Sequence, residues 1–380
     1  MERLVAAIRE HGTAGRAVRP VGGATKLDWA HPPGSASDAI DLETSSLDSI
    51  AEHNVGDFTA VLDAGVRVAD AQARFAAEGQ MLALDPPLGV ARADEVGRGD
   101  EGSGATIGGM IATNDSGPMR HRYGGVRDLV VGMTVVLSDG TVAKSGGKVI
   151  KNVAGYDLAK LFAGSYGTLG LIASVSVRLH PMPGEHATAL GASDDPQRLY
   201  EAAAELARHP LEADCLDVAW DGDAGRVLVR FGGAAAQHQA QEVVDRMAEL
   251  GLDDPGAETS DEEIWTRQRG AQRSADGMVI KVSGRPTDLP SVIAAARAQG
   301  GTVVSRAALG LSWLAVPAGA DVSAVRDALD PRPCVVLDGA RSVADAWPLP
   351  PEGTLAVMAR LKERFDPARI FRPGAYVGGI

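Results

Sequence analysis

The chain has 380 residues, of which 45% are hydrophobic, and a formal net charge of −13 at pH 7. This length exceeds what one ordinary hydrophobic core organises, so two domains are expected. The acidic residues are spread along the sequence and no basic block occurs. That pattern argues against nucleic acid as a partner, because Lys and Arg side chains that meet phosphates supply most of such affinity.

The sequence also bears on membranes and redox state. No apolar run approaches the ~20 residues that cross a bilayer, so no transmembrane segment is predicted. Residues 1–10 are typical of an amphipathic helix rather than a signal peptide. A cytoplasmic location is therefore expected, and association with a membrane through partner subunits stays open. Cys215 and Cys334 are the two cysteines; they fit a reducing compartment, and without a CxxC motif the chain alone offers no four-cysteine iron–sulfur cluster or structural zinc.

The first part of the chain mixes short strands with helices. The predicted elements are, in order, a helix over 2–11, strands near 17–21, 39–42 and 59–62, a helix over 68–78, a hairpin of 129–137 and 141–145, a short helix over 157–162 and a strand over 169–179. The hairpin prediction rests on Asp139-Gly140, a dipeptide that favours a two-residue turn. Two prolines and a glycine in residues 180–184 then mark a domain boundary.

The pattern changes after this boundary, and longer helices alternate with strands. Helices are predicted over 196–208, 235–250, 290–299, 322–329 and 354–365, and strands over 217–220, 226–231, 278–283, 302–305, 311–316 and 334–337. Helices packed on one face of a mainly antiparallel sheet, an α+β domain, are expected. We therefore divide the chain into residues 1–183 and 184–380.

Two glycine-rich segments stand out in the first domain, Arg19–Lys26 and Gly102–Gly117, and both are expected to be loops. Successive small residues let the backbone approach a ligand, and their N–H groups can form nests for phosphate oxygens. Two such segments indicate a long ligand such as a dinucleotide. Neither standard phosphate motif is present: Ile107 stands where GxGxxG needs its last glycine, and Val149 follows Lys148 where a Walker A loop needs Ser or Thr.

Simpler interpretations exist for two of these features. The first segment could be a tight turn with a solvated Lys26. A third glycine-bearing segment, Gly164–Ile172, could be a glycine-capped helix end that enters a strand.

Taken together, the segments Arg19–Leu27, Gly104–Pro118 and Lys151–Leu158 resemble the FAD-linked oxidases of the vanillyl-alcohol-oxidase type, which include the FAD-binding subunits of glycolate oxidases. The likeness continues through His121–Gly124 and Gly164–Ile172 and reappears at Leu361–Gly374. It implies a PCMH-type FAD-binding domain of two subdomains, followed by an α+β cap domain with a mainly antiparallel sheet, whose C-terminal segment returns to the FAD domain.

The resemblance also implies the cofactor and its contacts. Covalent members of the family present a histidine in the first segment, where this chain has Ala24-Thr25-Lys26, so non-covalent FAD is expected. The implied cofactor-binding residues are Pro20, Val21, Gly22, Gly23, Ala24, Thr25, Lys26, Pro86, Thr106, Ile107, Gly108, Gly109, Ala112, Thr113, Gly117, Tyr123, Gly124, Gly167, Gly170 and Ile172.

Two departures from the family pattern matter. Arg372 precedes Pro-Gly where relatives commonly have Asn, which leaves a flavin contact at this position open. The histidine-rich metal motif of related D-lactate and D-2-hydroxyglutarate enzymes is missing: after residue 180 the histidines are His186, His209 and His238. Because a metal needs clustered ligands, no metal is predicted.

The chemistry implied is oxidation of a small 2-hydroxy acid such as glycolate to a 2-keto acid, with hydride transfer to flavin N5. It needs a base and a cation for the carboxylate. His121 is a candidate base, since histidine titrates near neutrality, and Arg122 and Lys281 are candidate cations. Alternatively, His121 and Arg122 only support Tyr123, and Lys281 is an exposed strand lysine. Trp265 and Trp313 are expected in the cap core.

Two other functions stay open at this point. The chain could be a non-catalytic flavoprotein subunit that relays electrons or stabilises a complex whose sister subunit carries the metal-dependent site. It could also be a stand-alone oxidase. The partners implied by the resemblance are a larger flavin subunit and an iron–sulfur subunit.

Overall fold

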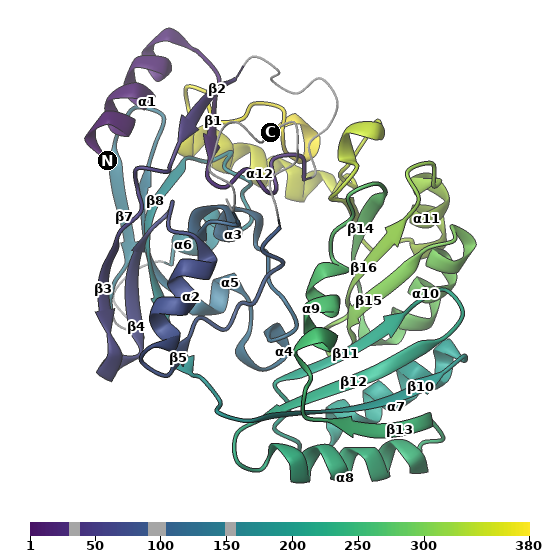
Figure 1. The fold of residues 1–380 in the computed structure, drawn as a ribbon. Coiled ribbons are helices and arrows are strands. Elements are labelled where there is room, and N and C mark those ends of the chain that lie inside the picture. The colour runs from purple at the N-terminus through teal and green to yellow at the C-terminus, as the bar shows by residue number, and fades with distance from the viewer. Residues whose placement is uncertain (30–38, 90–103, 149–156) are drawn as a thin grey trace.

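The computed structural model describes residues 1–29, 39–89, 104–148 and 157–380. The segment Lys151–Tyr156 of the third motif, together with Gly102 and Ser103, lies outside the described residues. Figure 1 shows two sheets side by side, each with its own helices, and the helix α9 (Glu262–Gly270) between them. The predicted α+β fold with mainly antiparallel sheets is confirmed.

The N-terminal part is organised around a five-stranded antiparallel sheet. In spatial order its strands are β3 (Ile50–Asn54), β4 (Thr59–Asp63), β8 (Leu171–Arg178), β6 (Val130–Val136) and β7 (Val142–Gly146). The helices on its inner side in Figure 1 are α2 (Val68–Ala76), α3 (Ile107–Thr113), α5 (Val126–Leu129) and α6 (Ala159–Phe162). One apolar cluster joins sheet and helices, so this layer fixes where α3 begins.

A smaller unit adjoins this sheet. The parallel pair β1 (Val18–Val21) and β2 (Ile40–Glu43) packs with α1 (Glu2–Ala14). Phe371, near the C-terminus, is fully buried in the same cluster and forms a bridge with Val18. The end of the chain therefore returns to the N-terminal part.

The C-terminal part contains one eight-stranded antiparallel sheet. Its strands, in spatial order, are β13 (Asp253–Glu258), β10 (His186–Ser193), β12 (Gly225–Gly232), β11 (Cys215–Trp220), β15 (Thr302–Arg306), β16 (Leu311–Val316), β14 (Met278–Ser283) and β17 (Cys334–Val336). The helices α7 (Pro196–Arg208), α8 (Ala236–Glu249), α10 (Leu289–Ala298) and α11 (Val322–Leu329) share its main core. The opposite face carries α9 through the buried Trp265. These separate cores support the proposed division after residue 183.

Some elements were not predicted from the sequence. Among them are β3, β10, β13 and α9. β13 has no large apolar side chain and forms at the edge of the sheet through pairing with β10. The second glycine-rich segment was expected as a loop, and this was wrong for residues 107–113: they form α3, whose Thr106 Oγ1 accepts a hydrogen bond from Gly109 N at 3.3 Å.

The last long helix, α12 (Glu352–Phe365), is held by a buried ion pair. Lys362 is its one buried residue, and its Nζ donates to Asp366 Oδ2, Thr168 O and Phe371 O, each at 2.7 Å. Asp366 also accepts from the backbone N of Phe371 at 2.9 Å. The pair therefore fixes the chain just before Arg372.

Replacing Lys362 by Met leaves the Asp366 carboxylate without its cation and two carbonyls without a donor. We expect Lys362→Met to lower the free energy of unfolding by about 3 kcal/mol, measured by urea denaturation. The matched control is Lys160→Met, which removes an exposed ion pair with Asp157 (3.2 Å, Lys160 side chain 52% exposed) and should cost less than about 1 kcal/mol. Equal effects of the two variants would show that the buried pair does not stabilise the chain.

Candidate cofactor site and interdomain contacts

A glycine-lined cavity lies where β1, α3 and the turn before β8 meet. It is open to solvent at its mouth. The residues that line it are Pro20, Val21, Gly22, Gly23, Ala24, Thr25, Lys26, Leu27, Thr44, Ala64, Ala105, Thr106, Gly108, Gly109, Ala112, Thr113, Tyr166, Gly167, Gly170, Ile172 and Arg372.

Close backbone packing explains the glycines of the first segment. A Cβ atom on Gly22 would lie 2.2 Å from Thr106 Oγ1, and one on Gly23 would lie 2.1 Å from Gly104 O. Neither contact is possible for a larger residue, so only glycine brings the two segments this close. Ala24 then takes a positive φ of 56°. The result is a cradle of backbone and small side chains that fits an extended nucleotide.

Five residues implied by the resemblance do not line this cavity: Pro86, Ile107, Gly117, Tyr123 and Gly124. Ile107 is fully buried in the apolar core. A Cβ on Gly117 would overlap Asp85 O at 1.9 Å, and Gly124, at φ 80°, packs against the Asp128 carboxylate. Pro86 is buried after β5 (Gln80–Met81).

Other lining residues were not predicted. They are Leu27, Thr44, Ala64, Ala105, Tyr166 and Arg372. Thr44 and Ala64 lie outside every quoted motif and reach the cavity through tertiary packing, so a spacing pattern could not have found them. The other four lie within the segments that carry the resemblance, but no cofactor contact was assigned to them there, and Arg372 was noted only as a departure.

Lys26 is not the solvated residue of the simpler interpretation. Only 7% of Lys26 is exposed, and its Nζ forms an ion pair with Asp115 Oδ2 at 2.7 Å. The same ammonium lies 5.4 Å from the centre of the Trp29 ring. The pair joins the first glycine-rich segment to the chain that follows α3.

The C-terminal part contacts the first glycine-rich segment directly. Arg273 Nη2 donates to Thr25 O at 2.9 Å, and Arg273 Nε donates to Asp338 Oδ2 at 2.9 Å. Trp29 Nε1 donates to the other oxygen of Asp338 at 2.8 Å. Asp338 thus holds Trp29 of the N-terminal part and Arg273 of the C-terminal part together.

Three of the cations at the boundary between the two parts influence one another electrostatically, and we call Arg120, Lys281 and Arg306 the interdomain cation cluster. Lys281, on β14, is half-buried, so its interpretation as an exposed strand lysine was wrong. Burial lowers the pKa of Lys281 to about 8; the negative Asp115 opposes this shift, and Arg120 and Arg306 reinforce it. The cluster is therefore a partly desolvated positive region beside Asp115.

The buried Trp313 lies between two members of the cluster. Its ring centre is 5.5 Å from Lys281 Nζ and 4.9 Å from Arg306 Cζ, within the range of cation–π attraction. Arg306 is fully buried and pairs with Asp217 at 2.7 Å. Trp313 and Trp265 are both at most 2% exposed, which agrees with their predicted place in the cap core.

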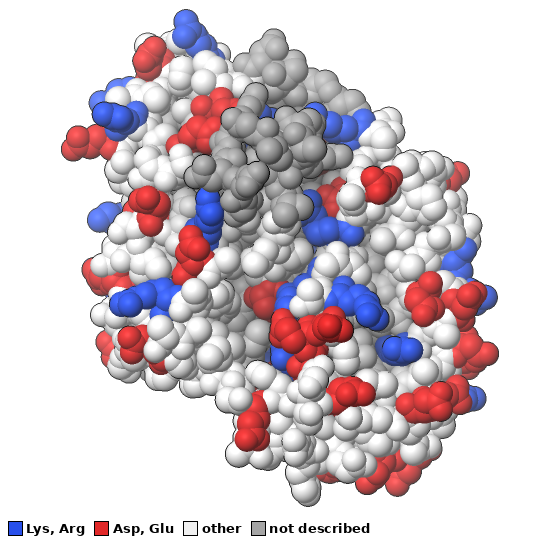
Figure 2. Space-filling model, viewed as in Figure 1, with Lys and Arg blue, Asp and Glu red and all other residues white. Residues whose placement is uncertain are grey.

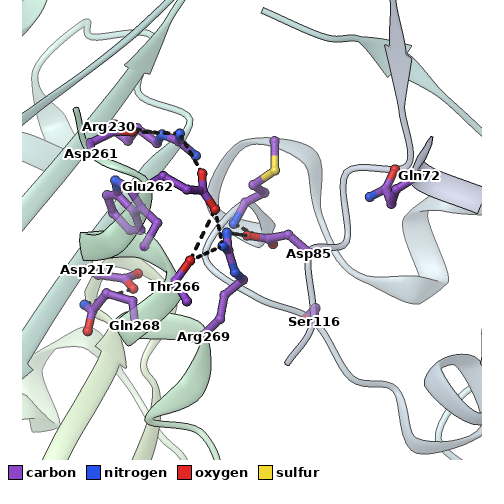
Figure 3. A network of polar contacts seen from close by, with 12 residues as sticks. Gln72, Asp85, Ser116, Asp217, Arg230, Asp261, Glu262, Thr266, Gln268 and Arg269 are labelled. Atoms are coloured by element: carbon purple, nitrogen blue, oxygen red, sulfur yellow. Dashed lines mark hydrogen bonds and ion pairs between the residues drawn. The ribbon is translucent and has the colours of Figure 1, made fainter. Parts of the chain in front are cut away.

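A second interdomain contact joins Asp85 to α9, as Figure 3 shows. Asp85 Oδ1 accepts from Met119 N at 3.1 Å, and its other oxygen lies 3.9 Å from Arg269 Nη1. Arg269 also donates to Glu262 at 2.7 Å. Burial raises the pKa of Asp85 to about 7, with Arg269, Arg306 and the Met119 amide opposing the rise and Asp217 adding to it. Its φ of 32° is unusual for a non-glycine residue.

The short helix α4 (Arg120–Tyr123) holds the remaining candidates. Arg122 Nη1 donates to Glu212 O at 2.7 Å and pairs with Asp214 at 3.3 Å. Tyr123 OH donates to the same Asp214 at 3.3 Å. These contacts favour the interpretation of Arg122 and Tyr123 as a support between the two parts. His121 is half-buried, and burial lowers its pKa; its catalytic role stays a prediction.

The described part of the chain carries neither a clustered set of metal ligands nor a membrane-spanning helix. Within residues 1–29, 39–89, 104–148 and 157–380, no three His, Cys, Asp or Glu side chains are grouped to hold a metal. Across the same ranges, none of the helices combines the length and apolarity needed to cross a membrane.

On the face in Figure 2, the Lys and Arg side chains of the described residues lie among Asp and Glu side chains.

Comparisons with known proteins identify the N-terminal part. Residues 1–146 match a family described as FAD binding domain. Two solved structures of alkyldihydroxyacetonephosphate synthase share the fold, with TM-scores of 0.69 and 0.70 at 14% identity; each alignment covers 98% of this chain and 75% of the other. The predicted likeness to FAD-linked oxidases is thereby confirmed, as is FAD as the cofactor of this domain.

Curated relatives match this chain over shorter stretches than the two solved structures do. D-lactate dehydrogenase [cytochrome] 1 of Saccharomyces cerevisiae is 29% identical over 202 residues, which are 53% of this chain and 32% of that protein. Glycolate oxidase subunit GlcE of Escherichia coli is 39% identical over 119 residues, 31% of each chain. The matched stretches thus span about a third of these relatives.

The raised pKa of Asp85 predicts a pH dependence of stability. The folded chain holds this proton up to about pH 7, whereas an unfolded Asp loses it near pH 4. The wild-type free energy of unfolding should therefore fall between about pH 4 and pH 7, by on the order of 2–4 kcal/mol relative to Asp85→Asn, which mimics the neutral acid.

Urea denaturation of both chains at several pH values measures this difference. The control is Asp139→Asn. Asp139 is exposed, and the hydrogen bonds from Thr141 lower its pKa. Replacing it should therefore not change how the free energy of unfolding varies between about pH 4 and pH 7. Parallel curves for wild type and Asp85→Asn would contradict the assignment.

Proposed function

We propose that this chain, whose residues 1–146 belong to the FAD binding domain family, is an FAD-dependent oxidoreductase that oxidises a small 2-hydroxy acid to a 2-keto acid. The proposal rests on the position of Asp115, which links the cavity to the interdomain cation cluster. Lys26 lines the cavity and pairs with Asp115, and Asp115 is the negative neighbour of Lys281. A cofactor site and an anion-attracting region therefore adjoin one another.

The cradle fits FAD bound without a covalent link. Its pyrophosphate would lie against residues 20–26 and the start of α3, where only glycine permits the observed backbone approach. The described residues that line the cavity include no His or Cys to which a flavin could be attached. When bound, FAD would supply the hydride acceptor, which no protein side chain provides.

Lys281 is our candidate for the substrate carboxylate. With its pKa lowered to about 8, this side chain is mostly protonated at pH 7. A bound carboxylate would offset its repulsion from Arg120 and Arg306. Lys acts as a point charge and lacks the two-pronged fork of Arg, so recognition would rest on charge more than on shape.

Two groups are candidates to accept the hydroxyl proton. Burial lowers the pKa of His121, so its ring is neutral near pH 7 and able to accept a proton. Asp85 is the second candidate, since its pKa of about 7 matches the task. Arg122 is less suited as a substrate cation, because Glu212 and Asp214 occupy it.

We further propose that the chain works as a subunit. Its relative from Escherichia coli is named as a subunit of glycolate oxidase, and a second similar protein, GlcD of Bacillus subtilis, is named in the same way. A larger flavin subunit and an iron–sulfur subunit would then receive the electrons.

An anaerobic visible spectrum of the purified chain tests the function. With FAD bound, addition of glycolate or D-lactate should bleach the flavin band near ~450 nm, because hydride transfer reduces the ring. A bound flavin that none of the small 2-hydroxy acids bleaches would support a relay subunit instead. A chain that rejects added FAD would overturn the proposal.

Lys281→Met tests the carboxylate site. We expect the KM for flavin reduction by the hydroxy acid to rise at least about tenfold, since a charge-assisted contact of about 1.5–3 kcal/mol is lost, while the Kd for FAD is unchanged. Lys281→Arg should restore most of the affinity. In the wild type, substrate affinity should fall as the pH rises through about 8, where Lys281 loses its proton.

The control for this experiment is Lys144→Met, which changes an exposed lysine on β7. An unchanged KM in Lys281→Met would remove this residue from the substrate site without affecting the cofactor assignment.

A further inference from the structure

Arg372 reaches the cofactor cavity from the C-terminal segment, far from the glycine-rich motifs in the sequence. Only 7% of this residue is exposed, and it is one of the residues that line the cavity. Its Cδ lies 3.7 Å from where a Cβ on Gly167 would be, beside the ring of Pro20. The side chain therefore runs between the first glycine-rich segment and the turn before β8.

We propose that Arg372 is a phosphate-binding residue of this site, whose guanidinium pairs with the diphosphate of FAD. The inference rests on the proposed function for the presence of FAD. It adds a charged contact to a cradle whose other charged side chain, Lys26, is already paired with Asp115. Guanidinium and phosphate match in charge and geometry, since the planar fork can donate two parallel hydrogen bonds.

The charges of the cavity wall support this role. Among the described residues that line it, Lys26 and Arg372 carry a charge and none is acidic. The charge of Lys26 is balanced by Asp115 at 2.7 Å. A diphosphate brings two negative charges into a partly enclosed site, where an uncompensated charge is costly. Arg372 supplies a second positive charge to the cavity wall.

The guanidinium is also fixed before any ligand arrives. Arg372 Nη1 donates to Tyr166 O at 2.8 Å, and Arg372 Nη2 donates to Leu27 O at 3.3 Å. Both carbonyls belong to residues of the cavity wall. The backbone N of Arg372 donates to Val18 O at 2.9 Å, and Lys362 binds the carbonyl of the preceding Phe371. Little ordering is then needed on binding.

The protonation state agrees with this role. Burial lowers the pKa of Arg372 to about 10, and the neighbouring Arg19 adds to the shift, while Tyr166 and Asp28 oppose it. The side chain thus stays charged at neutral pH. A bound phosphate would stabilise its charged form.

The test measures FAD binding to the apo chain by quenching of flavin fluorescence. Arg372→Asn installs the residue common in the resembling family, and we expect its Kd for FAD to rise at least tenfold. Arg372→Lys keeps a positive charge, and its Kd for FAD should lie between those of the wild type and Arg372→Asn. The matched control is Arg19→Asn: Arg19 is a neighbouring arginine that pairs with Asp41 at 2.7 Å and does not line the cavity.

Two further readouts separate phosphate binding from a structural role. Added NaCl should weaken FAD binding to the wild type more than to Arg372→Asn, because screening acts on the lost charge pair. ADP, which carries the diphosphate without the flavin, should compete with FAD on the wild type and lose at least tenfold of its affinity in Arg372→Asn. Riboflavin, which has no phosphate, should bind both chains equally.

The outcomes are distinguishable. A Kd within twofold of wild type in Arg372→Asn, with FAD still bound, would overturn the role of Arg372 and leave the proposed function intact. Equal losses of FAD and riboflavin, together with a lower apo melting temperature, would show that Arg372 is only structural. A wild type that binds neither FAD nor ADP would overturn the proposed function and this inference together.

Discussion

The buried ion pair between Lys26 and Asp115 is the contact on which the site depends. Both side chains are at most 5% exposed and 2.7 Å apart. Removing one partner would leave the other charged and desolvated, which costs far more than an exposed pair. The pair fixes the first glycine-rich segment against the chain that follows α3. The cavity exists because these two segments are held at that separation.

The same pair connects the cofactor site to the C-terminal part. Trp29 stacks near both Lys26 and Arg273, whose charged groups lie 5.4 and 5.1 Å from its ring centre. Arg273 in turn binds Thr25 O and Asp338. A shift of the C-terminal part relative to the N-terminal part would therefore displace the backbone of the first glycine-rich segment. The apolar cluster of Trp29, Tyr166 and Trp313 makes that displacement costly, since it spans both parts.

Local signals explain which features the sequence could predict. The helix α7 was visible because Asp195 caps it, Pro196 occupies its first turn and its apolar residues recur on one face. β13 carries no such signal, and only pairing with β10 makes it a strand. The glycine-rich motifs likewise marked the cavity, because their glycines are visible in the sequence, although the close approach that requires them joins two remote segments. The burial of Lys26 was not predictable, since its partner is remote in sequence and its exposure depends on packing.

The three side chains of the interdomain cation cluster carry like charges close together, which is electrostatically unfavourable and is not explained by packing. Arg120, Lys281 and Arg306 repel one another, and burial lowers the pKa of both Arg120 and Lys281. Asp217 neutralises Arg306, and the Trp313 ring offsets part of the remaining cost through its π face. Apolar side chains of similar volume would often stabilise such a position as well or better. Local conflicts of this kind are typical of functional sites, and an anion bound between Lys281 and its cationic neighbours would relieve this one.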